Sequence, residues 1–272
     1  MSSDARKSGL GDDRLALFES FALELGWAAA TAILPLYRAN VGIEDKGGDL
    51  GFDPVTAADR GAEQAIRAAI AGRYPEHGVI GEEEGEDRPD AEFVWVLDPI
   101  DGTRAFISGL PLWTTLIGLR FQGQPVVGLI GQPYLGEMFV GSARGSRLCR
   151  NGHETLLKVR PCAGLSHALC ATTDPDLFKA EEAAAWTRLR RSARLARYGC
   201  DAYAYAMVAA GALDLVVETG LKSWDVEAAV PLLAGAGGEV TDWEGCPVGR
   251  DGGRILIAGD RRVIDEARLV LA

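Results

Sequence analysis

Two carboxylates follow closely on an apolar segment in the first half of the chain. Residues 95–103 read WVLDPIDGT, passing from strand-forming residues to two acids, a proline, a glycine and a hydroxyl. The β-branched and aromatic content of residues 93–97 predicts a buried strand. Asp98 is therefore expected where this strand leaves its sheet, which is where ligands bind in open α/β sheets.

The turn after this strand should hold Asp98 and Asp101 close together. Pro99 pushes Asp98 toward an extended conformation, and Gly102 permits a tight turn. Two bare carboxylates about 4 Å apart would repel by roughly 4 kcal/mol at an effective dielectric of 20. A hard divalent cation relieves that repulsion while it accepts their oxygens, so the motif predicts a metal site. The alternative, an Asp101 that only caps a surface turn, leaves Asp98 unexplained.

The residues after Asp101 predict what the metal would hold. Gly102 and Thr103 should open a short helix that runs to Ser108, and the free N–H groups at such a helix start suit a phosphate. The hydroxyl of Thr103 is then available to orient a water molecule.

Three further acids stand beside predicted elements. Asp59 falls in the first turn of a helical pattern over residues 62–70, Glu82 is the first residue past a strand that ends at Gly81, and Asp225 begins an apolar helix over residues 226–233. Taken singly, Asp59 and Asp225 could be ordinary helix caps. The acids after Glu82 are expected to form a solvated loop.

Taken together, these segments resemble the inositol monophosphatase superfamily of magnesium-dependent, lithium-sensitive phosphatases. The resemblance runs from about residue 12 to the C-terminus and rests on residues 81–83 (GEE), 98–103 (DPIDGT), 224–225 (WD) and 235–238 (GAGG). Residues 104–111, 116–119, 171–175, 201–206 and 217–222 resemble the histidinol-phosphatase branch. Inositol-specific members usually carry Thr-Asn-Phe where this chain has RAF at 104–106.

The resemblance implies a set of metal ligands. Glu82, Asp98 and the backbone carbonyl of Ile100 match the ligands of a first Mg²⁺, and Asp98, Asp101 and Asp225 match those of a second. A third, weaker ion would share Glu82, which is therefore also expected to act in catalysis. Oxygen-only ligands favour Mg²⁺ or Mn²⁺ over zinc, and the resemblance implies inhibition by Li⁺.

The resemblance also implies roles in catalysis and substrate binding. Asp59 and Thr103 match the pair that orients and deprotonates the attacking water, and Glu218 matches an acid that contacts the non-phosphate part of the substrate. The residues expected to bind the phosphate or the substrate are Asp101, Gly102, Thr103, Arg104 and Glu218. Ions about 3.5 to 4 Å apart can clamp phosphoryl oxygens and activate water for in-line displacement.

Composition bounds the partners of the protein. A net charge of −11 and a pI near 4.8 argue against nucleic acid or an anionic membrane as a partner. The resemblance implies a small phosphate monoester as the expected partner. The apolar stretches, such as residues 28–36, look too short to span a membrane, and no signal peptide is recognisable, so a cytoplasmic location is expected. The resemblance implies a homodimer.

The remaining polar residues predict no second site. Five cysteines without metal-binding spacing should be reduced and mostly buried. The three histidines, His77, His153 and His167, are expected in ordinary surface or turn positions. The basic run at residues 188–197 predicts a solvated helix face, with a subunit contact as the alternative.

The predicted fold is a mixed α/β (α+β) protein, a layered αβαβα sandwich of the inositol monophosphatase type. Residues 1–160 should form an N-terminal half with a long first helix, an antiparallel sheet and most metal ligands. Residues 161–272 should form a smaller half that contributes Glu218 and Asp225, with the site between them. The glycine-rich residues 46–52 predict a mobile segment that delivers residues 53–59 to the site.

These expectations lead to three hypotheses. The first is a Mg²⁺-dependent histidinol-phosphatase of histidine biosynthesis, which converts L-histidinol phosphate and water to L-histidinol and phosphate. The second is an inositol-1-monophosphatase or broad sugar-phosphate phosphatase. The third is a catalytically silent scaffold protein.

Overall fold

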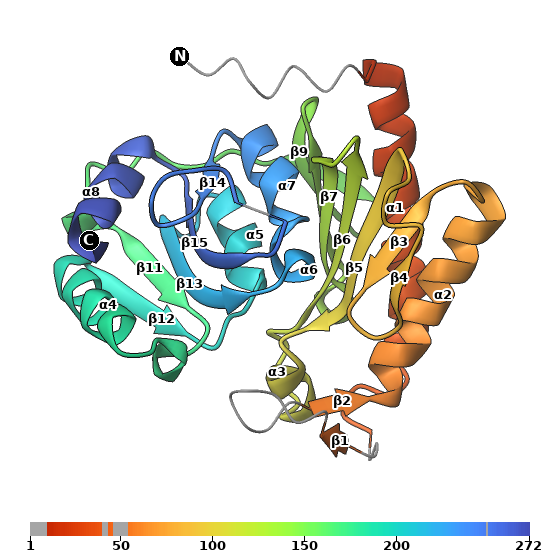
Figure 1. Ribbon diagram of the computed structural model, residues 1–272, viewed down its shortest axis with the longest axis horizontal. Helices are drawn as coiled ribbons and strands as arrows, with labels where there is room; N and C mark the ends of the chain where they lie inside the picture. The colour runs from red at the N-terminus through yellow and green to blue at the C-terminus, as the bar shows by residue number, and fades with distance from the viewer. Residues whose placement is uncertain (1–9, 40–42, 46–53, 249) are drawn as a thin grey trace.

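The computed structural model describes residues 10–39, 43–45, 54–248 and 250–272, so the predicted mobile segment at residues 46–52 lies outside the described residues. Helices and sheets alternate in five layers (Figure 1). This confirms the predicted αβαβα sandwich. The helices are α1 (Asp12–Ile33) and α2 (Ala57–Arg73) in the first layer, α5 (Tyr203–Ala209), α6 (Ser223–Val226) and α7 (Ala229–Ala236) between the sheets, and α4 (Glu181–Ser192) and α8 (Arg261–Leu271) in the last. A short helix, α3 (Thr103–Ile107), follows the first acidic motif.

The larger sheet has eight strands in the order β10-β9-β8-β7-β6-β5-β3-β4, and only β3 and β5 run parallel. The predicted antiparallel meander is confirmed by β6 to β10. The strands are β3 (Gly78–Gly81), β4 (Gly85–Asp87), β5 (Phe93–Asp101), β6 (Thr114–Phe121), β7 (Gln124–Gln132), β8 (Glu137–Ser142), β9 (Gly145–Arg150) and β10 (His153–Leu156). A separate ribbon of β1 (Ile43–Asp45) and β2 (Pro54–Thr56) precedes α2.

The smaller sheet has five strands in the order β12-β11-β13-β15-β14. They are β11 (Leu169–Thr172), β12 (Leu195–Tyr198), β13 (Leu215–Leu221), β14 (Glu239–Thr241) and β15 (Gly253–Ala258). The prediction of one helical face over residues 188–197 is wrong for its second part, because Arg197 lies on the edge strand β12 and Arg194 just precedes it. An edge strand exposed to solvent carries polar residues as readily as a helix face does, so charge alone could not separate the two.

Helix α1 is a core helix that also has the composition of a membrane span. The helix is long and apolar enough to cross a membrane, whereas the sequence analysis expected the apolar stretches to be too short. Half of its most apolar window is buried inside the protein. Leu25 and Ile33 are fully buried in a core shared with α2 and the larger sheet. Its apolar character is therefore accounted for by packing inside this protein.

The five cysteines are free, as expected, but only Cys162 and Cys170 are buried and Cys246 is exposed. His77 is also buried, against the expectation of a surface or turn position, and stacks on Tyr74 and Phe93. Its Nδ1 accepts a hydrogen bond of 3.1 Å from Nε1 of Trp95. Burial, with Arg14 and Arg88 nearby, lowers the pKa of His77 from 6.5 to about 4.

This lowered pKa predicts a loss of stability in mild acid. Below about pH 6.5 His77 is protonated in the unfolded chain, whereas in the native state it stays neutral down to about pH 4. The free energy of unfolding therefore decreases as the pH falls through this range. His77→Gln keeps an acceptor for Trp95 but does not titrate. Between pH 7 and pH 5, urea unfolding should show the unchanged protein losing about 1–2 kcal/mol more than His77→Gln. The exposed His153→Gln is the control, and equal losses in all three proteins would refute the assignment.

Candidate metal centre

Asp98 and Asp101 occupy the end of β5, where the strand pairing with β6 is irregular. Asp98 pairs with Leu116 and Asp101 with Thr114, and the register shifts between them. Asp98 was expected where the strand leaves its sheet, and regular pairing does end there. One further pair forms at Asp101, beyond a bulge that contains Pro99, which has no N–H to donate. Gly102 then turns the chain with φ of +80° into α3, as predicted.

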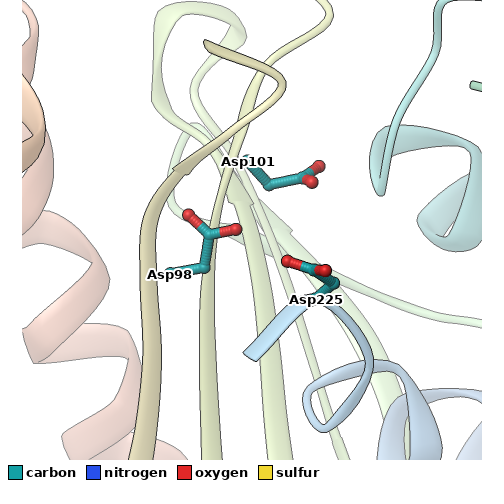
Figure 2. A group of neighbouring side chains, drawn as sticks. All are labelled: Asp98, Asp101 and Asp225. Carbon is teal, nitrogen blue, oxygen red and sulfur yellow. The ribbon is translucent and has the colours of Figure 1, made fainter. Parts of the chain in front are cut away.

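Three carboxylates from two distant parts of the chain meet at this strand end. Asp98, Asp101 and Asp225 each place an oxygen within 4.8 Å of the others, and they are the group of acids that meets this limit within the described ranges. Figure 2 shows the three carboxylates grouped together, two from β5 and one from α6. The sequence-based prediction brought these three acids together, and the structure does the same.

The protein holds two of the three carboxylates by hydrogen bonds of its own. Asp101 Oδ2 accepts the backbone N–H of Ala202 at 2.7 Å, and Asp225 Oδ2 accepts that of Lys222 at 2.7 Å. Asp98 is 2 % exposed, and its Oδ1 has no hydrogen-bond partner among the residues the structure describes. A buried carboxylate oxygen without a donor is costly unless something else satisfies it. The donor set, oxygen only and anionic, fits Mg²⁺ or Mn²⁺.

The electrostatics of the group point the same way. Burial, then the charges of Glu82, Asp101 and Asp225, raise the pKa of Asp98 well above its usual range. Burial, then Asp201 and Asp225, do the same to the pKa of Asp101. Burial raises the pKa of Asp225 to about 6. The three groups oppose one another's ionisation, and a divalent cation among them would remove that opposition.

The other predicted metal and water residues surround this group. Glu82 follows β3, and its charge is the largest neighbouring influence on Asp98, although it lies outside the group of three. The hydroxyl of Thr103 donates to the carbonyl of Ile100 at 3.0 Å. These residues lie near the centre as the resemblance implied, but their assignment as ligands or catalytic groups stays a prediction.

Asp59 caps α2, which is one of the two interpretations that the sequence left open, and its role with the attacking water stays a prediction. Its Oδ2 accepts the N–H and the hydroxyl of Thr56 at 2.8 and 2.6 Å, which completes a capping box at the start of α2. Its charge also raises the pKa of Asp98. Capping fixes the side chain in one orientation beside the acidic group.

Asp225 lies in a single-turn helix and not at the start of a long one. The predicted continuous helix over residues 226–233 is wrong, because α6 ends at Val226 and α7 begins at Ala229. Pro231 has no N–H to donate to the carbonyl of Glu227, so a helix cannot run through this point without losing a hydrogen bond. The break lets α6 direct Asp225 at β5 while α7 packs along the larger sheet.

The second predicted half adds an acid that the sequence analysis did not assign to the site, although residues 201–206 contribute to the family resemblance. Asp201 lies against the turn of the first motif, since a Cβ on Gly102 would stand 3.1 Å from Asp201 Cγ. Burial raises the pKa of Asp201 to about 6, against the lowering effect of Arg104. No spacing rule connects residue 201 with residue 102, and only the long-range packing reveals it.

Glu218 and Arg104 border the same region. Glu218 is 1 % exposed and accepts hydrogen bonds from the N–H of Thr173 at 2.8 Å and from the hydroxyls of Thr172 and Thr173 at 3.1 Å. Burial raises the pKa of Glu218 to about 8. Arg104 is about half exposed and lies 3.9 Å from Asp174. Direct substrate contact by Glu218 or Arg104 stays a prediction.

Comparison with known proteins agrees with this geometry. The model of the inositol monophosphatase family matches residues 15–270. The chain is 42 % identical over 245 residues to the bifunctional phosphatase IMPL2, chloroplastic, of Arabidopsis thaliana, covering 89 % of this chain and 69 % of that protein. It is 34 % identical over 226 residues to a histidinol-phosphatase of Chlorobaculum parvum, covering 82 % of this chain and 85 % of that protein.

A solved structure gives the same fold. The inositol monophosphatase of Zymomonas mobilis superposes with a TM-score of 0.83 at 42 % identity, covering 93 % of this chain and 96 % of the other. The family model spans nearly the whole chain, and the sequence relatives and the solved structure agree with it. The chain therefore belongs to the inositol monophosphatase family of phosphatases.

Proposed function

We propose that the protein is a Mg²⁺-dependent histidinol-phosphatase of histidine biosynthesis, which hydrolyses L-histidinol phosphate to L-histidinol and phosphate. The observation that supports metal-dependent chemistry is the unpaired, buried Oδ1 of Asp98 inside the group of three carboxylates. The observation that favours this substrate is the position of the Asp201 carboxyl against the Gly102 turn. The relative from Chlorobaculum parvum bears the name of this activity.

The residues of the acidic group would hold the metal. Asp98 and Asp101 offer oxygens from β5 and Asp225 from α6, and Glu82 and the Ile100 carbonyl are the further ligands that we assign. Magnesium, when bound, supplies positive charge that draws in the phosphate dianion, stabilises charge on its oxygens and lowers the pKa of a water molecule. Without such charge, the phosphate would face several carboxylates on a protein of net charge −11.

Asp59 and Thr103 are assigned to the attacking water. The two Thr56 bonds hold the Asp59 carboxylate in place next to Asp98, so it can accept a proton without moving. The hydroxyl of Thr103 donates a hydrogen bond to the carbonyl of Ile100, so the Thr103 oxygen can still accept a hydrogen bond from a water molecule. The backbone N–H groups of Gly102 and Thr103 are assigned to the phosphate, with Asp101 and Arg104 beside it.

Asp201 is assigned to the leaving group of the substrate. In-line displacement expels the alcohol on the side opposite the attacking water. Because the water-orienting pair comes from the first predicted half, we assign the alcohol to the side of the second half. We assign Asp201, which lies against the Gly102 turn, to that side, and Arg104 is the nearby cation that lowers its pKa. Burial raises the pKa of Glu218 to about 8, so near neutral pH this buried acid adds little negative charge. A leaving group with an ammonium or imidazolium is attracted to such a surface, whereas a neutral polyol gains less.

A second substrate class has support of its own. The solved structure at 42 % identity is an inositol monophosphatase, and IMPL2 is called bifunctional. An inositol or sugar phosphate would present hydroxyls to the same acids. The cytoplasmic location and the homodimer also stay predictions, and the name of IMPL2 includes the word chloroplastic.

The direct test compares phosphate release from L-histidinol phosphate and from myo-inositol 1-phosphate, each with Mg²⁺ and with a chelator. We expect metal-dependent release with a kcat/KM at least about tenfold higher for histidinol phosphate, a difference of about 1.4 kcal/mol. The reverse preference would establish the second class, and no release from either substrate would support a silent scaffold.

Asp98→Asn should abolish metal binding and activity together while leaving the fold intact, because one ligand charge is lost at constant volume. Turnover should fall by at least about a hundredfold, and calorimetry should show weaker Mg²⁺ binding. Asp176→Asn, an exposed aspartate outside the acidic group, is the matched control. Near-normal turnover in Asp98→Asn would refute the assignment of this residue.

Asp201→Asn should change substrate preference more than metal binding. Loss of this charge should raise the KM for histidinol phosphate about tenfold, or about 1.4 kcal/mol, and leave the KM for myo-inositol 1-phosphate within about twofold. The Mg²⁺ affinity of the same variant, measured by calorimetry, separates a substrate effect from a metal effect. Equal changes in KM for the two substrates would contradict the role assigned to Asp201.

A further inference from the structure

Three glycines lie side by side across the larger sheet, on the face that meets the middle layer. Gly118 on β6 pairs with Gly128 on β7, which pairs with Gly141 on β8. None of the three has a positive φ, so turn geometry does not explain them. We call residues 118, 128 and 141 the glycine row.

The glycine row is in contact with the chain that follows Asp225. A Cβ on Gly128 would stand 1.9 Å from the carbonyl oxygen of Ala228, and one on Gly141 would stand 2.8 Å from Cα of Leu232. A Cβ on Gly118 would stand 3.1 Å from Cβ of Glu227. The backbone at Ala228 and Leu232 therefore lies directly on the sheet, closer than a side chain at Gly128 or Gly141 would allow.

A buried ion pair fixes the start of this segment. Arg120 lies on β6, two residues beyond Gly118, and its Nε donates to both carboxylate oxygens of Glu227 at 2.7 Å. Its Nη2 also donates to Glu227 Oε1. Both residues are buried, with 5 % and 7 % exposure. At the far end of the segment, the hydroxyl of Ser146 donates to the carbonyl of Leu232 at 2.7 Å.

The ion pair connects the two sources of metal ligands by a short path. Glu227 follows Asp225 by two residues, next to the break between α6 and α7. Arg120 lies on β6, which pairs directly with β5 and its Asp98. Metal–oxygen bonds need ligands placed within a few tenths of an ångström. A shift of the segment along the glycine row would move Asp225 relative to Asp98 and Asp101.

Stability alone is a weak reason for such a pair. Exchanging a buried ion pair for apolar residues of similar volume is often neutral or stabilising, whereas a bidentate pair fixes one geometry. The glycine row has no side chains that would fix the position of residues 227–232 along it. The ion pair lies where this position has to be fixed.

We propose that Arg120 and Glu227 are positioning residues that set the register of residues 227–232 on the glycine row and thereby the place of Asp225 in the metal centre. They touch neither substrate nor metal. The inference rests on the proposed function in that it takes the three carboxylates to bind a divalent cation. It makes the affinity for that cation depend on a contact outside the site.

The test measures cation binding, not activity. Mn²⁺ binding is followed by electron paramagnetic resonance, and the site in question is the one lost in Asp225→Asn. The double variant Arg120→Met/Glu227→Met removes both charges, so no carboxylate is left buried alone. We expect it to fold and to bind Mn²⁺ at this site at least tenfold more weakly. Arg120→Lys, which keeps the charge but not the fork, should weaken binding about threefold.

Arg160→Met is the matched control, because Arg160 also donates to a buried carboxylate, that of Asp214, but away from the glycine row. Its Mn²⁺ affinity should stay within twofold of the unchanged protein whatever its melting temperature. Folded Arg120 and Glu227 variants with unchanged Mn²⁺ affinity would overturn the inference while leaving the proposed function intact. Should the double variant not fold, Arg120→Lys decides by the same criterion. Failure of the unchanged protein to bind Mn²⁺ would overturn both proposals.

Discussion

Mutual repulsion among buried carboxylates is the constraint on which this structure depends. Asp98, Asp101 and Asp225 each place an oxygen within 4.8 Å of the others, and burial and neighbouring charge raise the pKa of each. Like charges do not gather in this way unless the rest of the fold holds them or a cation joins them. The free energy gained by packing the layers thus offsets the repulsion among the three carboxylates, and such clusters of perturbed acids are typical of functional sites.

The layered fold supplies that support through its middle layer. Helices α5, α6 and α7 lie between the two sheets, so they transmit the position of one to the other (Figure 1). Ala202, at the start of α5, donates its N–H to Asp101, and α6 carries Asp225. The first of these contacts holds a carboxylate of the centre, and the second element presents one. The close approach at Gly128 leaves little freedom in the spacing.

Much of the fold and of the centre could be predicted from local sequence. The strand before Asp98, the turn at Gly102, the helix that starts near Asp59 and the meander from β6 onward are set by alternation, turn residues and capping patterns that neighbouring residues carry. The acids of the centre were found because each follows such an element and because together they resemble a known family.

What could not be predicted arises from contacts between distant residues. The sequence around Asp201 has no feature that links it to Gly102, and Glu227 was hidden inside an apparently continuous apolar helix. Pro231 was the local signal for the break in that helix, and it was overridden by the strong apolar pattern. The strand β12 was mistaken for part of a helix because of its arginines, since an exposed edge strand and a solvated helix face have similar composition.

The most direct test of a shared metal centre is a crystal structure of the protein grown with Mn²⁺ and phosphate, with anomalous diffraction used to locate the ions. We expect the anomalous peak to mark a Mn²⁺ ion about 2.1–2.2 Å from oxygens of Asp98, Asp101 and Asp225, with phosphate beside Gly102 and Thr103. Manganese bound elsewhere, with these three carboxylates left unliganded, would contradict it.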